Sequence, residues 1–87
     1  MPYSIKFSPH AAKQFAKLDK GTQRQVSNYL DKIQDVESPY DLGKSLMGNL
    51  SGLWRYRVGK YRIICEIRDN ELIIEVITIA KRDTVYK

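Results

Sequence analysis

Cysteine and histidine are almost absent from this chain of 87 residues, which contains one of each, Cys65 and His10. A single cysteine excludes an internal disulfide, and one cysteine with one histidine offers no cluster of metal ligands. No Ser/His/Asp set, Cys/His set or pair of carboxylates stands out as a catalytic group. We therefore expect no metal site and no cofactor, and we interpret His10 as a surface residue.

Long apolar runs are also missing. No segment approaches the roughly 20 apolar residues that cross a bilayer, and no apolar signal segment stands at the N-terminus. The chain contains no internal repeat and no linker-like stretch of Gly, Ser and Pro. We expect one domain over residues 1–87, a cytoplasmic location and no membrane partner.

Acidic residues are outnumbered by basic ones. The sequence contains 15 Lys and Arg against 10 Asp and Glu, which gives a net charge of +5 and a pI near 9.4. That balance suits a polyanionic partner, either nucleic acid or an acidic protein, but it also serves solubility alone. Clustering of the cations along the chain would favour a polyanionic partner over solubility alone.

Hydrophobic periodicity predicts the element order β-α-α-β-β-β. Ser8 as N-cap and Pro9 at the first helical position begin the first helix. Thr22 begins the second, with Gln25 in capping-box spacing. The expected elements are a strand over 3–7, helices over 8–18 and from 22 to about 37, a loop over 37–52, and strands over 53–58, 61–68 and 71–80.

Two dipeptides, Gly59-Lys60 and Asp69-Asn70, are typical two-residue hairpin turns and connect the last three strands. The final strand, "LIIEVITIA", is apolar on nearly both faces, so we expect it to be central and to pair with the first strand. The predicted fold class is α+β, with a helical hairpin packed on a small, mostly antiparallel four-stranded sheet.

The segment "WRYRVGKYR" contains four cations, Arg55, Arg57, Lys60 and Arg62, and no anion. If Gly59-Lys60 is the turn, Arg57 lies directly across from Arg62, and Arg55 shares their face. Like charges directly opposite each other are destabilising unless an anion lies between them. This face is therefore a candidate phosphate site. The alternative is an ordinary solvated face that Glu66 and Glu75 neutralise.

The C-terminal segment "KRDTVYK" adds Lys81, Arg82 and Tyr86 directly after the central strand. Tyr86 can hydrogen-bond a hydroxyl group or stack on a base. Its alternative interpretation is a packed terminal aromatic residue.

Three fragments together resemble the RelE/ParE superfamily of toxins from bacterial toxin–antitoxin systems. "IKFSPHAAKQFAKLDK" resembles the opening strand and helix of that superfamily, "LSGLWRYRVGKYRIICEI" its central hairpin, and "LIIEVITIAKRDTVYK" its last strand and tail. The resemblance covers nearly the whole chain. The tail pattern Arg-x-x-x-Tyr resembles the RelE branch rather than the gyrase-poisoning ParE branch.

The resemblance implies a metal-independent endoribonuclease, an mRNA interferase that cuts mRNA in the ribosomal A site and inhibits translation. It also implies a cognate antitoxin in a hetero-oligomeric complex. By position, Arg57, Arg62, Arg82 and Tyr86 correspond to catalytic residues. Arg55, Lys60 and Lys81 are assigned to RNA binding.

Arg55 and Arg57 stand where well-known RelE-type sites have lysines. Arginine does not lose its proton at accessible pH, so these side chains can bind phosphate but cannot act as a base. Two alternatives stay open. One is a ParE-like gyrase inhibitor without nuclease activity, and the other is a basic nucleic-acid-binding domain without catalysis.

Overall fold

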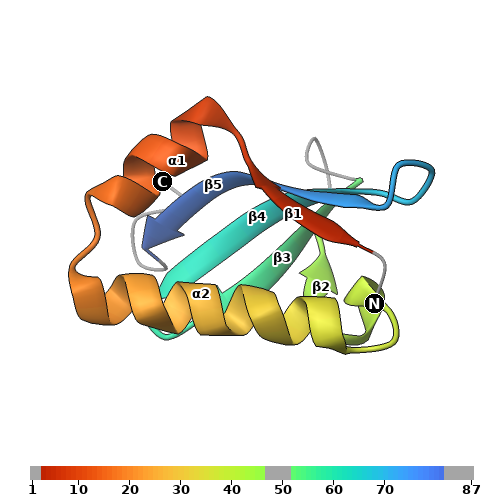
Figure 1. Cartoon of the computed structure of the whole chain (residues 1–87), viewed down its shortest axis with the longest axis horizontal. Coiled ribbons are helices and arrows are strands. Elements are labelled where there is room, and N and C mark those ends of the chain that lie inside the picture. Colours follow the sequence, from red (N-terminus) through yellow and green to blue (C-terminus); the bar gives the residue numbers. More distant parts are fainter. Residues whose placement is uncertain (1–2, 47–51, 82–87) are drawn as a thin grey trace.

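The chain forms a five-stranded mixed sheet that packs with two helices (Figure 1). The computed structural model describes residues 3–46 and 52–81. The strands are β1 (Ser4–Phe7), β2 (Lys44–Ser45), β3 (Leu53–Val58), β4 (Tyr61–Arg68) and β5 (Ile73–Lys81). The helices are α1 (Pro9–Ala16), α2 (Lys20–Asp35) and the short 3₁₀ helix η1 (Pro39–Asp41). The predicted α+β class is confirmed.

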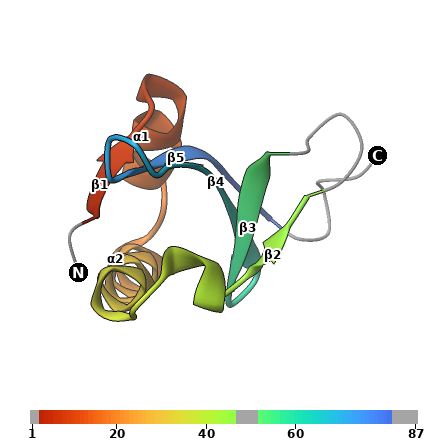
Figure 2. The same cartoon turned by 90° about the vertical axis from the view of Figure 1, so that its right-hand side faces the viewer.

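The strand order is β1-β5-β4-β3-β2, so β5 is central between β1 and β4, as the apolar final strand predicted. β1 runs parallel to β5, and the other neighbouring pairs are antiparallel. Figure 2 shows that the chain leaves α2 through η1 and reaches β2 beside β3, at the opposite end of the sheet from β1 and α1.

The predicted number of four strands is wrong, because β2 lies within the segment that was expected to be a loop. The indole Nε1 of Trp54 donates a hydrogen bond to the Leu42 carbonyl oxygen at 2.6 Å, and Leu46 N donates to Leu53 O at 3.1 Å. These bonds hold the segment against the edge of β3. A two-residue strand carries no detectable period, so only the long-range pairing reveals it.

The start of α1 is as predicted, and the start of α2 is not. Ser8 accepts a hydrogen bond from Ala11 N at 3.0 Å, and its hydroxyl donates to Ile77 O at 3.0 Å, which ties the helix start to β5. The predicted start of the second helix at Thr22 is wrong. Asp19 is the N-cap, because its carboxylate accepts from both the backbone N and the hydroxyl of Thr22.

The turn at Gly59-Lys60 is confirmed, with Gly59 at the positive φ of 57° that such a turn requires. The predicted two-residue turn at Asp69-Asn70 is wrong. Strands β4 and β5 are joined by four residues, 69–72, and their first paired residues are Arg68 and Ile73. Leu72 takes a positive φ of 56°, and its N–H donates to Asp69 O.

One core joins both helices to a single face of the sheet. Its buried members are Ala11, Val26, Leu30, Ile33, Tyr56, Val58, Ile63, Cys65, Ile74, Val76 and Ile79. In β5 the register skips Ile77, and this bulge lets both Val76 and Ile79 reach the core. The residues that alternate with these along β3 and β4 therefore lie on the other face. No helix among residues 3–46 and 52–81 is long and apolar enough to cross a membrane.

Candidate functional site

Arginine side chains gather on the sheet face that is turned away from the core. Arg57 and Arg62 are directly paired across β3 and β4, and Arg55 is paired with Ile64 on the same face. The register that the Gly59-Lys60 turn predicted is therefore confirmed. Ile64 is only 7% exposed. The charged groups thus lie next to an apolar surface, where electrostatic interactions are stronger than in bulk water.

Arg62 is half-buried, and its Nε and Nη1 atoms are shielded from solvent. Arg57 is exposed. Directly opposite side chains in an antiparallel pair have Cβ atoms about 5 Å apart, so two guanidinium groups share a small volume. A phosphate group in that volume can accept hydrogen bonds from both forks.

Lys44 extends this cationic row to a third strand. It is paired with Arg55 across β2 and β3, which is a second directly opposed pair of like charges. We refer to Lys44, Arg55, Arg57 and Arg62 as the cationic face. Among the described residues, neither Lys44 nor Arg55 forms an ion pair. Sequence reasoning missed Lys44 because it treated the segment as a loop.

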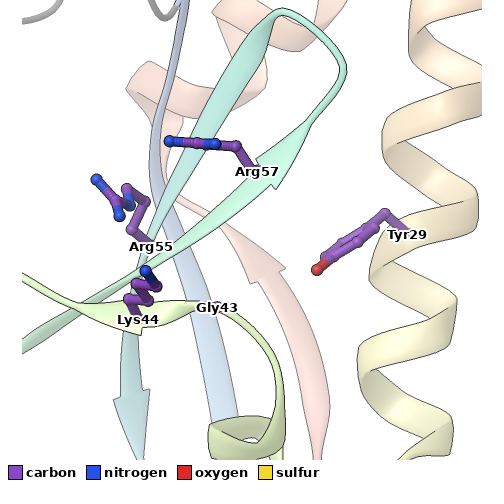
Figure 3. Close-up of a pocket in the computed structure, with 5 residues that line it drawn as sticks. All are labelled: Tyr29, Gly43, Lys44, Arg55 and Arg57. Carbon is purple, nitrogen blue, oxygen red and sulfur yellow. The ribbon is translucent and has the colours of Figure 1, made fainter.

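A pocket of about 220 Å³ opens beside the cationic face and is lined by Tyr29, Gly43, Lys44, Arg55 and Arg57. Figure 3 shows the side chains of Arg55 and Arg57 directed away from α2, while Tyr29 extends from α2 toward Gly43. The ring of Tyr29 packs against the core, and the residue also lines this pocket.

The ring of Tyr29 is held by its neighbours. It packs against Tyr56 with ring centroids 5.9 Å apart, and the Lys32 ammonium group lies 5.7 Å from its centroid. Burial raises the pKa of Tyr29 above its ordinary value, so the hydroxyl stays protonated at neutral pH. It makes no hydrogen bond within residues 3–46 and 52–81.

The carboxylates that were considered as neutralising groups for the cationic face bind another cation. Glu66 and Glu75 are directly opposed in β4 and β5, and both form ion pairs with Arg68. Glu71 adds a third contact to the same guanidinium group at 3.5 Å. Hydrogen bonding to Glu66 is the main cause that raises the pKa of Arg68. This acidic cluster lies toward the turn at 69–72, at the far end of β4 from Arg62.

The structure does not bring every predicted site residue together. Lys60 lies in the β3–β4 turn and is exposed. Lys81 is paired with Tyr61, which places it by register on the face that carries the core, opposite the cationic face. Arg82 and Tyr86 lie outside the described residues, so their roles stay predictions. His10 is exposed on α1, as expected.

The buried thiol is not a candidate nucleophile. Cys65 is fully enclosed in the core, and burial raises its pKa to about 12. A thiol nucleophile reacts as the thiolate, which this environment strongly disfavours. The described part of the site therefore offers positive charge and one tyrosine hydroxyl. Fold and site together define a small basic α+β protein whose open sheet face suits a phosphate-bearing polyanion.

The sequence pattern of a known family, described as "ParE toxin of type II toxin-antitoxin system, parDE", matches residues 5–86. The chain therefore belongs to this family of type II toxins, within the RelE/ParE superfamily.

Curated relatives carry RelE names. A RelE-like toxin protein of Escherichia coli is 32% identical over 85 residues, which cover 95% of this chain and 86% of that protein. Toxin RelE of Mycobacterium tuberculosis is 38% identical over 52 residues, which cover 60% of this chain and 54% of that protein.

Solved structures share the fold. The toxin–antitoxin complex RelBE2 from Mycobacterium tuberculosis contains a chain with a TM-score of 0.83 at 24% identity, covering 94% of this chain and 93% of that one. The isolated Escherichia coli RelE toxin gives a TM-score of 0.77 at 17% identity, and the match covers 97% of this chain and 88% of that one.

Proposed function

We propose that this protein is a RelE-type toxin that binds mRNA in the ribosomal A site through its cationic face and cleaves it. The observation that carries the proposal is the direct opposition of Arg57 and Arg62 on a face that Arg55 and Lys44 extend. Glu66 and Glu75 on β4 and β5 form their ion pairs with Arg68. A phosphodiester chain presents one negative charge per nucleotide, which suits this row of cationic side chains.

The reaction would be attack of a ribose 2′-OH on the adjacent phosphodiester. It breaks the bond to the 5′-oxygen and leaves a 2′,3′-cyclic phosphate and a 5′-OH. Arg57 and Arg62, together with Arg82, would hold the phosphate and stabilise the additional negative charge of the transition state. Arginine remains protonated, so none of these residues is the base.

Tyr86 is the proposed group that orients or deprotonates the 2′-OH. Its ordinary pKa of about 10 makes it a weak base, and nearby cations would lower that pKa by favouring the phenolate. Single-turnover cleavage of mRNA on programmed ribosomes tests the role, because it isolates chemistry from product release. Tyr86→Phe should slow cleavage about 100- to 10,000-fold if the hydroxyl transfers a proton. A rate within about twofold of the parent, less than one neutral hydrogen bond supplies, would exclude that role.

The proposal includes a cytoplasmic location and a cognate antitoxin. Several solved structures with the same fold are toxin–antitoxin complexes, among them the intact RelBE complex of Escherichia coli. The antitoxin would cover part of the cationic face with acidic side chains. Electrostatic steering would then make its association rate fall as salt rises.

A second candidate function is gyrase inhibition of the ParE type. It is favoured by the family description, which names ParE, and by a fold match to a YoeB/ParE toxin from Agrobacterium tumefaciens with a TM-score of 0.74. Induction of the toxin alone separates the two functions. An mRNA-cleaving toxin should stop methionine incorporation before thymidine incorporation. The reverse order, with an SOS response, would overturn our proposal in favour of ParE activity.

A further inference from the structure

Lys44 is positioned by the fold rather than by a flexible loop. Gly43, the residue before it, has φ +72°, and a side chain there would collide with the Arg55 carbonyl oxygen. The same added Cβ would lie 2.8 Å from Tyr56 and 2.9 Å from Trp54 Nε1. This close approach lets β2 lie against β3 and sets Lys44 opposite Arg55.

Tyr29 lines the other side of the pocket, and its neighbours also hold it in place. Its ring is fixed against Tyr56, and its hydroxyl is a protonated donor that points toward Gly43 (Figure 3). Half-buried hydroxyl groups usually find a partner in the protein or in a ligand. Within the described residues this one has none, while cationic side chains line the same pocket.

The dimensions favour more than one phosphate group. The cationic face crosses three neighbouring strands, which lie about 4.8 Å apart, so it extends about 10 Å from Lys44 to Arg62. A single phosphate bound between Arg57 and Arg62 leaves Lys44 and Tyr29 uncontacted. A nucleic acid strand repeats its charge at every nucleotide, and a neighbouring nucleotide would reach them.

We propose that Lys44 and Tyr29 form a second nucleotide subsite for the mRNA strand, next to the cleaved phosphodiester. Lys44 and Arg55 bind the phosphate of the flanking nucleotide, and the Tyr29 hydroxyl donates a hydrogen bond to the same nucleotide. Arginine and lysine around one pocket, continuous with the Arg57–Arg62 pair, fit a phosphodiester chain better than isolated carboxylates of a protein partner. This inference rests on the proposed function.

The test measures binding without cleavage. Ribosomes are programmed with an mRNA that carries 2′-O-methyl groups at the A-site codon, which blocks attack by the 2′-oxygen. A second set carries an mRNA that ends after the P-site codon. The ratio of the two dissociation constants reports the contribution of the mRNA strand. The variants are Lys44→Ala, Lys44→Arg and Tyr29→Phe. Arg57→Ala is the reference for the neighbouring phosphate, and Lys13→Ala is the control that removes one exposed lysine from α1.

Lys44→Ala should weaken binding to the full mRNA about 10- to 100-fold, the range for a hydrogen bond to a charged group, and Lys44→Arg should restore it. For Lys44→Ala, the slope of the logarithm of the binding constant against the logarithm of the salt concentration should become shallower by about 0.7, the value for one phosphate contact with a single strand. Tyr29→Phe should weaken binding about fivefold without changing that slope. Lys13→Ala should match the parent in both measurements.

The subsite is excluded if Arg57→Ala reduces the preference for the full mRNA while Lys44→Ala and Tyr29→Phe behave like Lys13→Ala. It is also excluded if Lys44→Ala weakens binding to both ribosomes equally, or weakens only antitoxin binding, because Lys44 then contacts another partner. If the parent protein shows no preference for the full mRNA, the proposed function fails as well. Thermal melting of each variant confirms that it is folded.

Discussion

Arg57 and Arg62 lie directly opposite each other in the antiparallel pair of β3 and β4, with their side chains on the face away from the core. The same sheet contains an opposed pair of carboxylates, Glu66 and Glu75, and there Arg68 provides the counter-ion. The counter-ion of the acidic pair is therefore an arginine of the same sheet. The arginine pair sits on the face that we assign to the phosphates of a substrate.

Arg57→Ala and Arg62→Lys separate charge from geometry at this pair. Arg57→Ala removes one charge-assisted contact, so cleavage of mRNA on programmed ribosomes should slow about 10- to 100-fold. Arg62→Lys keeps the charge but loses the planar fork, so we expect a smaller loss of a few-fold to about tenfold. The measurement is the single-turnover rate at saturating toxin.

Lys13→Ala is the matched control, because it removes the same charge from an exposed position on α1. Its cleavage rate should equal that of the parent. If Arg57→Ala cleaved as fast as this control at equal soluble concentration, the cationic face would not be the catalytic surface.

The local part of the fold was predictable where short-range chemistry determines it. The Gly59-Lys60 turn sets the register of β3 and β4, and side-chain alternation then places Arg57 and Arg62 on one face. Ser8 caps α1 because its hydroxyl reaches a backbone N–H three residues ahead. The apolar character of both faces of β5 indicated its central position.

The parts that sequence reasoning missed depend on contacts distant in the chain. β2 exists because Gly43 permits a close approach to residues that follow about ten positions later. Lys44 therefore joins the site through tertiary pairing, without a motif. The use of Asp19 instead of Thr22 as cap was a choice between two good capping residues, which the bond from the Thr22 hydroxyl to Asp19 decides.

Arg68 should stabilise the acidic end of the sheet. Arg68→Ala leaves Glu66 opposite Glu75, whose side chain is only 14% exposed. We expect the free energy of unfolding to fall by about 1–2 kcal/mol, because a partly buried carboxylate loses its counter-ion. Arg24→Ala removes an exposed arginine from α2 and should change stability by less than about 0.5 kcal/mol. Urea unfolding measures both, and equal values would contradict the proposed role of Arg68.

Substitution of Gly43 tests whether the close approach of β2 to β3 is required, and substitution of Gly52 is the matched control. Both have positive φ, 72° and 94°, so alanine at either site adds about 1 kcal/mol of backbone strain. A Cβ at Gly52 meets nothing within 4 Å in the part of the chain that the structure describes, whereas at Gly43 it collides with β3. Gly43→Ala should therefore destabilise the protein by about 1 kcal/mol or more beyond Gly52→Ala in urea unfolding, since overpacking adds to the strain. Equal losses would mean that β2 moves away freely.

The thiol of Cys65 should make stability fall at alkaline pH. Burial raises its pKa from 9 to about 12, so the folded protein keeps a proton that the unfolded chain releases. Because the unfolded state then binds fewer protons, the free energy of unfolding decreases as pH rises through this interval. Between pH 9 and pH 10 the expected loss is about 1 kcal/mol.

Tyrosines contribute mainly at higher pH than the thiol, and burial raises the pKa of Tyr29, Tyr40 and Tyr56 as well. The hydrogen bond from the Tyr3 hydroxyl to Asp69 is the main cause that raises the pKa of Tyr3 to about 12, so its contribution is lost above pH 10. Urea unfolding at pH 8, 9 and 10 should show a smaller loss of stability between pH 9 and pH 10 in Cys65→Ala than in the parent or in Tyr3→Phe, and the tyrosines account for the loss that remains. If Cys65→Ala kept the full slope between pH 9 and pH 10, another group would be responsible. Rapid modification of the thiol in the native protein would likewise contradict its burial.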